Sequence, residues 1–177
     1  MTANVIEAND RGREHRSPAI ELSTVLTPNR VTNDLNVSSK KRLLEIMSGL
    51  LLKDNHGLDR DTVFQILLER ERLGSTGIGN GVALPHGRVN GIDQAIGAFS
   101  TLRNPLDYDS LDNQPVNMVF ALLVPADAHE AHLKLLSHLA EMFNDAAFRD
   151  GLVQSSTPDH LYSSFLERDR PAYRNAR

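Results

Sequence analysis

One histidine stands in a setting that suits a nucleophile. His86 lies between Pro85 and Gly87, directly after a glycine-rich stretch. Because proline fixes φ before the histidine and glycine adds no side chain after it, we expect the imidazole to be displayed at the rim of that stretch, at the end of a short strand. A neutral imidazole needs no base to attack phosphorus. The pattern therefore favours His86 as an acceptor of a phosphoryl group.

The stretch before this histidine, residues 74–81, has the sequence GSTGIGNG and is too rich in glycine for the interior of a helix or strand. Such glycines let backbone N–H groups converge on one point, which is how the main chain builds an anion site. The candidate phosphate-binding positions are Ser75, Thr76, Gly77, Gly79, Asn80 and Gly81. The alternative is that the glycines only turn the chain between a helix and a strand.

The same stretch differs from two nucleotide-binding motifs. A Walker motif would have Lys followed by Ser or Thr where this chain has Asn80-Gly81. A dinucleotide-binding fingerprint would have a small residue in place of Val82 and would open a helix, whereas a strand is expected here. We therefore expect no nucleotide cofactor.

Phosphoryl transfer needs positive charge around the phosphoryl oxygens, because its catalysis is mostly electrostatic. Arg70 lies 16 positions before His86, at the end of the helix expected to lead into the glycine-rich stretch. This arginine is therefore the preferred cation. Arg72 and Arg88 are rivals, and each also fits a solvated surface position.

A second histidine, His132, lies on the apolar face of an expected helix, three residues before Leu135. It is either a hydrogen-bonded core residue or a member of the site. His129 and His132 have the wrong spacing for the zinc motif H-E-x-x-H and lack an evident third ligand, so we expect no metal.

Composition limits the classes of protein to consider. The chain has 177 residues, of which 40% are hydrophobic and 24% charged, and this favours one globular domain. Without cysteine, it cannot use disulfides, thiol catalysis or cysteine-bound metals. Its net charge of −4 provides no drive toward nucleic acid or anionic lipid. The apolar run 116–124 is too short to span a bilayer, and residues 1–16 resemble no targeting peptide, so a cytoplasmic protein is expected.

Periodicity and capping residues define the elements that would position these side chains. Ser39, Asp59 and Thr157 are expected N-caps of three helices, and Asp127 with Glu130 has the spacing of a capping box for a fourth. The expected helices cover 40–53, 60–72, 127–143 and the residues from 158, and the expected strands cover 82–84, 95–102 and 116–124, with a short opening element at 20–26. Strands that alternate with helices predict an α/β domain.

The residues from Arg70 to Gly87, RERLGSTGIGNGVALPHG, resemble the active-site signature of phosphotransferase-system enzyme IIA proteins of the fructose/mannitol type. The segment GSTGIGNG at 74–81, together with DNQPV at 112–116 and FALLVP at 120–125, is similar to the sequences of the nitrogen-related regulatory branch of this family. The resemblance extends from about residue 21 to about residue 166. It implies a single-domain α/β sandwich over 18–167, with a mixed sheet of about five strands flanked by helices on both faces, between a flexible extension at 1–17 and a flexible tail at 168–177.

This resemblance also implies roles for individual residues. His86 would accept a phosphoryl group, on its ε nitrogen, from the phosphocarrier protein HPr or its nitrogen-branch paralogue, with enzyme I and phosphoenolpyruvate upstream. Arg70 would steady the phosphohistidine, and His132 would be the second histidine of the active centre. No cofactor is implied.

Sugar-transporting relatives pass the phosphoryl group to IIB and IIC domains, which this chain does not contain. Standalone members of the nitrogen-related branch act as regulators whose phosphorylation state governs binding to targets such as potassium-uptake proteins and sensor kinases. Two alternatives remain open: a sugar-uptake IIA that donates to a separate IIB protein, and an interaction module whose histidine is never phosphorylated.

Overall fold

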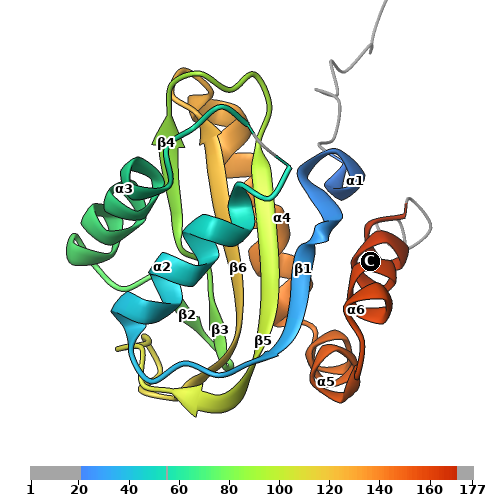
Figure 1. Cartoon of the computed structure of the whole chain (residues 1–177). Coiled ribbons are helices and arrows are strands. Elements are labelled where there is room, and N and C mark those ends of the chain that lie inside the picture. The colour runs from blue at the N-terminus through green and yellow to red at the C-terminus, as the bar shows by residue number, and fades with distance from the viewer. Residues whose placement is uncertain (1–20, 55, 171–177) are drawn as a thin grey trace, which may run out of the picture.

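A six-stranded mixed sheet lies between two groups of helices (Figure 1). The computed structural model describes residues 21–54 and 56–170, so the expected flexible segment 1–17 and most of the expected tail lie outside the described residues. The elements are α1 (Leu22–Val25), β1 (Leu26–Leu35), α2 (Lys40–Leu51), α3 (Arg60–Arg72), β2 (Gly77–Gly79), β3 (Val82–Ala83), β4 (His86–Val89), β5 (Ile96–Leu106), β6 (Val116–Pro125), α4 (His129–Asn144), α5 (Ala146–Gln154) and α6 (Pro158–Asp169).

The sheet has the strand order β1-β5-β6-β3-β2, and β4 pairs with β6 beyond the end of β3. β5 runs antiparallel to β6, whereas β1 is parallel to β5 and both β3 and β4 are parallel to β6. This confirms the expected mixed sheet flanked by helices. It has one strand more than the five expected, because residues 86–89 form a strand of their own.

β6 is buried on both faces, as its near-continuous apolar sequence predicts. One face packs against α1, α4, α5 and α6, through the residues Phe99, Phe120, Leu122, Leu135, Leu139, Phe143, Leu161 and Phe165 among others. The other face packs against α2 and α3, through the residues Leu43, Leu44, Met47, Val63, Leu67, Val119, Ala121 and Leu123 among others. The two cores explain the three layers seen in Figure 1.

Three predicted helix caps are confirmed. Ser39 Oγ accepts a hydrogen bond from Arg42 N at 3.2 Å, and an Asp59 carboxylate oxygen accepts one from Thr62 N at 2.8 Å. Thr157 Oγ1 accepts one from His160 N at 3.3 Å. Each bond satisfies an amide that the first turn of a helix leaves without a partner.

The predicted capping box is wrong. α4 begins at His129 with Ala128 as its N-cap, and no side chain caps it. The chain leaves β6 through a turn in which Ala128 N donates to Pro125 O at 3.1 Å, and the helix starts one residue later than the box requires.

Besides β2 and β4, two elements were not anticipated. β1 continues to Leu35, although only a short element at 20–26 was expected, because parallel pairing with β5 holds a polar sequence in a strand. The separate helix α5 follows α4 and is capped by Asp145, which accepts from Ala147 N at 2.9 Å. Tertiary pairing and a cap at an unexpected position outweighed the local pattern.

The chain remains helical to Asp169, so the expected start of the tail at residue 168 is two residues too early. Asp169 is buried and accepts a hydrogen bond from Leu22 N at 2.7 Å. His138 Nε2 lies 2.7 Å from the other Asp169 carboxylate oxygen. These contacts join α6 to α1 and α4.

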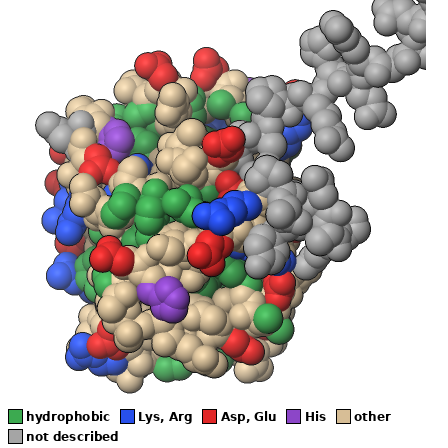
Figure 2. All heavy atoms as spheres, turned by 90° about the vertical axis from the view of Figure 1, so that its right-hand side faces the viewer, with side chains coloured by type: hydrophobic (Ala, Val, Ile, Leu, Met, Phe, Trp, Pro, Cys, Tyr) green, Lys and Arg blue, Asp and Glu red, His purple; other side chains and the backbone are tan. Residues whose placement is uncertain are grey.

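The helices of the described residues are all too short or too polar to cross a bilayer. Figure 2 views the molecule from the side on which α5 and α6 lie in Figure 1. On the described part of this face, acidic and basic side chains are interspersed around small groups of hydrophobic ones.

Candidate active site

The strand that carries His86 continues past it. β3 and β4 pair with β6 in one unbroken register, Val82 opposite Met118 and His86 opposite Leu122. Pro85 interrupts the ladder because it lacks an N–H group, but its carbonyl accepts a hydrogen bond from Leu122 N at 2.9 Å. His86 lies at a strand end, as expected, but it is the first residue of β4 rather than the end of β3, because pairing with β6 resumes at His86 itself.

Gly87 allows a helix to approach this strand. The residue is buried, and a Cβ atom at this position would collide with Ile66 of α3. Gly87 thus serves close packing as well as access to the imidazole. Because α3 lies against β4, its last turn brings Arg70 to His86.

His86 has a defined arrangement around both ring nitrogens. Nδ1 lies 2.7 Å from Leu84 O, and Nε2 lies 3.2 Å from Arg70 Nε. A carbonyl can only accept, so Nδ1 carries the hydrogen and Nε2 presents its lone pair. Burial lowers the pKa of His86, the Leu84 hydrogen bond opposes this shift, and the Arg70 charge adds to it. The ring is therefore neutral at pH 7, with its nucleophilic electron pair on Nε2.

His132 lies beside His86, with ring centroids 5.3 Å apart and the rings edge to face. The residue is buried, and its Nε2 has no hydrogen-bond partner among the described residues. Burial, followed by the charges of His86, Arg88 and Arg70, lowers the pKa of His132 to about 4. A buried ring nitrogen without a partner indicates a place for a ligand atom.

The three arginines considered from the sequence have different surroundings. Arg70 contacts His86 and also donates to Gly74 O at 2.9 Å. Arg88 donates from Nε to His132 Nδ1 at 3.3 Å, and its NH1 lies 2.5 Å from His129 Nδ1. Arg72 is exposed, and its side chain has no hydrogen bond to any described residue. Within residues 21–54 and 56–170, neither Arg70 nor Arg88 forms an ion pair with a carboxylate.

The expectation that the glycine-rich stretch lies outside any strand is wrong for residues 77–79, which form β2 and pair with β3 in a β-hairpin. Asn80 and Gly81 form its turn with φ values of 56° and 77°, which suits an Asn-Gly pair. Asn117 N donates to Gly81 O at 2.9 Å, so the turn lies beside the start of β6. Asn117 is five positions from Leu122, the partner of His86, and at ~3.3 Å per residue the turn is about 16 Å from His86 along the strand.

The base of the hairpin lies nearer. Leu84 N donates to Thr76 O at 2.9 Å, two residues before His86. Several N–H groups of the stretch already have acceptors, since Gly77 N donates to Ser75 Oγ at 3.1 Å and Asn80 N donates to Asp112 Oδ2 at 2.9 Å. Of the six candidate phosphate-binding positions, Ser75, Thr76 and Gly77 belong to the base, and Gly79, Asn80 and Gly81 to the distant end.

Sequence reasoning missed Glu71, which holds the base of the hairpin. Its buried carboxylate accepts from Thr76 N at 3.1 Å and pairs with Lys40 Nζ at 3.1 Å, and the Thr76 hydroxyl also contacts it. Tyr108 OH donates to it at 3.3 Å, and burial together with this carboxylate raises the pKa of Tyr108. Within the charged run 69–72, nothing in the sequence distinguishes Glu71 from Glu69, which is exposed.

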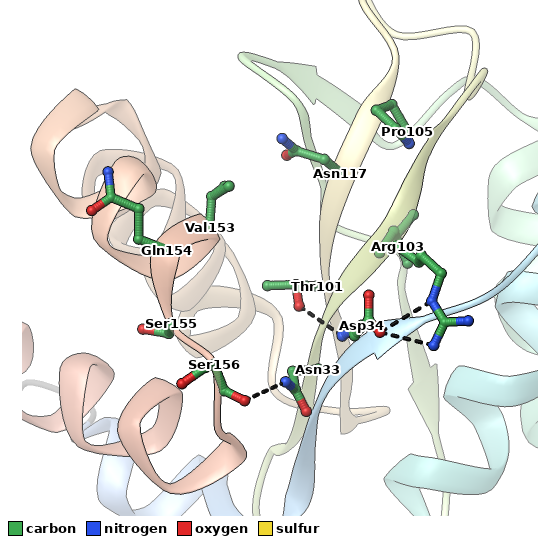
Figure 3. A pocket seen from close by; sticks show the side chains of 11 residues that line it. Asn33, Asp34, Thr101, Arg103, Pro105, Asn117, Val153, Gln154, Ser155 and Ser156 are labelled. Carbon is green, nitrogen blue, oxygen red and sulfur yellow. Dashed lines mark hydrogen bonds and ion pairs between the residues drawn. The ribbon is translucent and has the colours of Figure 1, made fainter.

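A separate pocket of about 580 Å³ opens between the ends of β1 and β5 and the α5–α6 connection (Figure 3). Its lining is part polar and part apolar, and Asp34 binds the Arg103 guanidinium at 2.8 and 3.0 Å. Asn33 Nδ2 donates to Ser156 O at 2.8 Å across the pocket. This pocket contains none of the predicted site residues.

Comparisons with known proteins agree on one family. Residues 24–168 match the model described as "Phosphoenolpyruvate-dependent sugar phosphotransferase system, EIIA 2". The nitrogen regulatory protein of Pseudomonas aeruginosa is 43% identical over 148 residues, which is 84% of this chain and 96% of that protein. The nitrogen regulatory protein of Escherichia coli K12 is 42% identical over 151 residues, with 85% and 92% covered.

Solved structures support the same assignment. The crystal structure of nitrogen regulatory protein IIA-Ntr from Neisseria meningitidis superposes with a TM-score of 0.75 at 41% identity, covering 80% of this chain and 96% of that one. The crystal structure of mannitol IIA from Escherichia coli gives a TM-score of 0.67 at 17% identity, covering 79% and 98%, and shows the shared fold alone. The chain therefore belongs to the EIIA 2 family of the phosphoenolpyruvate-dependent phosphotransferase system, and the relatives that share 41% to 43% of its sequence are nitrogen regulatory proteins.

Proposed function

We propose that this chain carries a phosphoryl group on Nε2 of His86 and acts as a phosphorylation-dependent regulator. The observation that supports this most strongly is the Leu84 carbonyl at 2.7 Å from His86 Nδ1, because it keeps the nucleophilic lone pair on Nε2. Arg70 and Arg88 provide positive charge nearby that no described carboxylate neutralises. A doubly charged anion is the ligand that such a centre suits.

The transfer balances without any added proton. The lone pair of His86 Nε2 attacks the phosphorus of a phosphohistidine on the phosphocarrier protein, the N–P bond of the carrier breaks, and the carrier nitrogen keeps the electron pair. Arg70 Nε, 3.2 Å from His86 Nε2 before transfer, then donates to a phosphoryl oxygen instead. His132 Nε2, which is buried and has no partner among the described residues, would donate to another.

Among the candidate phosphate-binding positions, those at the base of the hairpin fit the proposed site better than those in its turn. Ser75, Thr76 and Gly77 lie close to Leu84, whereas the turn is about 16 Å from His86 along β6. A shift of Gly77 N from the Ser75 hydroxyl to a phosphoryl oxygen would give the group a main-chain donor.

Phosphorylation would change how a partner binds this surface. The phosphoryl group adds about −1.5 to −2 charges at pH 7. Leu73, which follows α3, is 86% exposed, and Leu133, next to His132, is 65% exposed. A partner that covers these leucines would meet the altered charge at His86. We propose that upstream donors are enzyme I and HPr or its nitrogen-branch paralogue, that readers include potassium-uptake proteins or sensor kinases, and that the exchange occurs in the cytoplasm.

The central experiment is intact-protein mass spectrometry after incubation with phosphoenolpyruvate, enzyme I and the phosphocarrier protein, quenched in alkali. We expect one acid-labile phosphoryl group on the wild type and none on His86→Ala. His160→Ala, a change at an exposed histidine, is the matched control and should be labelled like the wild type. A fully labelled His86→Ala protein would contradict the proposal.

A sugar-uptake role has one observation in its favour. The fructose-specific EIIA component of Haloferax volcanii is 28% identical over 147 residues and is matched over 96% of its length. Rapid loss of the label to a fructose-type IIB protein would support this role, whereas a stable label that alters binding to a target protein would support regulation.

A further inference from the structure

Four side chains of the centre meet between β4 and the first turn of α4. His86 and Arg88 share one face of the strand, and His129 and His132 share one face of the helix. The Arg88 fork lies between the two helix histidines, with Nε 3.3 Å from His132 Nδ1 and NH1 2.5 Å from His129 Nδ1. The Arg88 guanidinium therefore contacts the Nδ1 atom of each of the two rings.

This contact determines which nitrogen of each ring bears hydrogen. A guanidinium has five N–H donors, no acceptor, and keeps its charge at every pH the protein meets. Each Nδ1 that faces it must present a lone pair, so the hydrogen of a neutral ring lies on Nε2. For His132, this is the buried nitrogen that has no partner among the described residues.

We propose that Arg88 is a positioning residue that holds His132 in its neutral Nε2–H form, so that His132 can donate a hydrogen bond to the phosphoryl group on His86. His129 shares the guanidinium and restricts its orientation. This inference rests on the proposed phosphorylation of His86, but the tautomer of His132 is a property of the protein without phosphate.

The surroundings of His132 favour the neutral form. Arg88 and His86 of β4, Arg70 of α3 and His129 of α4 each disfavour a positive charge on the ring. The acidic side chain in the lining of the cavity of about 210 Å³ that contains His132 is the exposed Asp93, and Glu71 of α3 acts on the adjacent His86. Without the Arg88 fork, the ring loses one cationic neighbour and the contact that distinguishes its two nitrogens, so its pKa should rise and both tautomers should be populated.

The test uses long-range ¹H–¹⁵N imidazole spectra of the unphosphorylated full chain at pH values from 7.5 to 4.5. In the wild type, we expect His132 to show hydrogen on Nε2 alone and to remain neutral down to pH 5. Arg88→Gln should mix the two tautomers and raise the pKa of His132. Arg88→Lys keeps the charge without the fork, so the pKa should stay low while the tautomers mix. Arg72→Gln, at an exposed arginine, should match the wild type.

A His132 ring in Arg88→Gln with the wild-type tautomer and pKa would overturn the inference, whether or not the variant can be phosphorylated. The lifetime of the label supplies the functional measurement. Arg88→Gln should lose its phosphoryl group roughly fivefold faster than the wild type, the effect of about one neutral hydrogen bond. A wild type that takes no label would refute the proposed function, and the spectra would still decide the role of Arg88.

Discussion

Arginine side chains have different partners at the two ends of the sheet. At the His86 end, Arg70 and Arg88 donate to histidine nitrogens and have no carboxylate partner among the described residues. At the opposite end, Arg103 is held by Asp34 at 2.8 and 3.0 Å in the pocket of Figure 3. The pocket is the roomier feature, at about 580 Å³, but its arginine charge is already neutralised. Arginine charge without a carboxylate partner beside the proposed nucleophile, rather than cavity size, indicates the end of the sheet that suits an anion.

The sharpest way to break this comparison is to remove one arginine from each end. Arg70→Ala should slow phosphoryl transfer to His86 by about 100-fold, since one electrostatic donor in such a site is worth ~3 kcal/mol. Arg103→Ala should leave the transfer rate unchanged, because its side chain is 55% exposed and pairs with an exposed carboxylate. Rapid-quench labelling from the phosphorylated carrier measures both rates. Equal rates for the two variants would show that unpaired charge does not identify the functional end.

A second test compares a glycine packed at the His86 end of the sheet with a glycine that has open space around it. Gly87→Ala should lower the free energy of unfolding by about 2 kcal/mol, because the added methyl group meets Ile66 where α3 packs on β4. Gly151→Ala is the matched control: it lies in α5 with open space around it, and should stabilise the chain by ~0.5 to 1 kcal/mol. Urea denaturation measures both. If the two changes have the same sign, close approach of α3 is not what requires glycine at 87.

A further prediction concerns pH. Folding lowers the pKa of His86, and lowers that of His132 to about 4. The unfolded chain therefore binds protons below pH 6.5 that the folded chain does not, and stability should fall as pH drops from 6.5 to about 4, by no more than ~1.4 kcal/mol per pH unit for each histidine. Urea denaturation across this range should show a shallower decline for His132→Asn than for the wild type. An unchanged slope in that variant would contradict the lowered pKa, and His160→Asn should behave like the wild type.

Much of the fold could be predicted from local signals. Ser39, Asp59 and Thr157 cap their helices as their positions indicate, and the apolar run at 116–124 forms the central strand. The signals failed where a distant contact decided the outcome. β1 is stabilised by pairing with β5, about 70 residues away in the chain, and α4 starts after a turn that displaces the expected capping box.

The candidate active site also depends partly on local sequence and partly on distant contacts. The sequence by itself determined the reactive residue types and their order: a histidine after proline, an arginine at a helix end, a second histidine on a later helix, and a glycine pattern that resembles one family. Only the tertiary structure decided that Arg88 contacts His132 across 44 positions and that Glu71 is buried beneath the hairpin. The tautomer and pKa of an imidazole depend on the donors, charges and water around it, and those neighbours are brought together by folding.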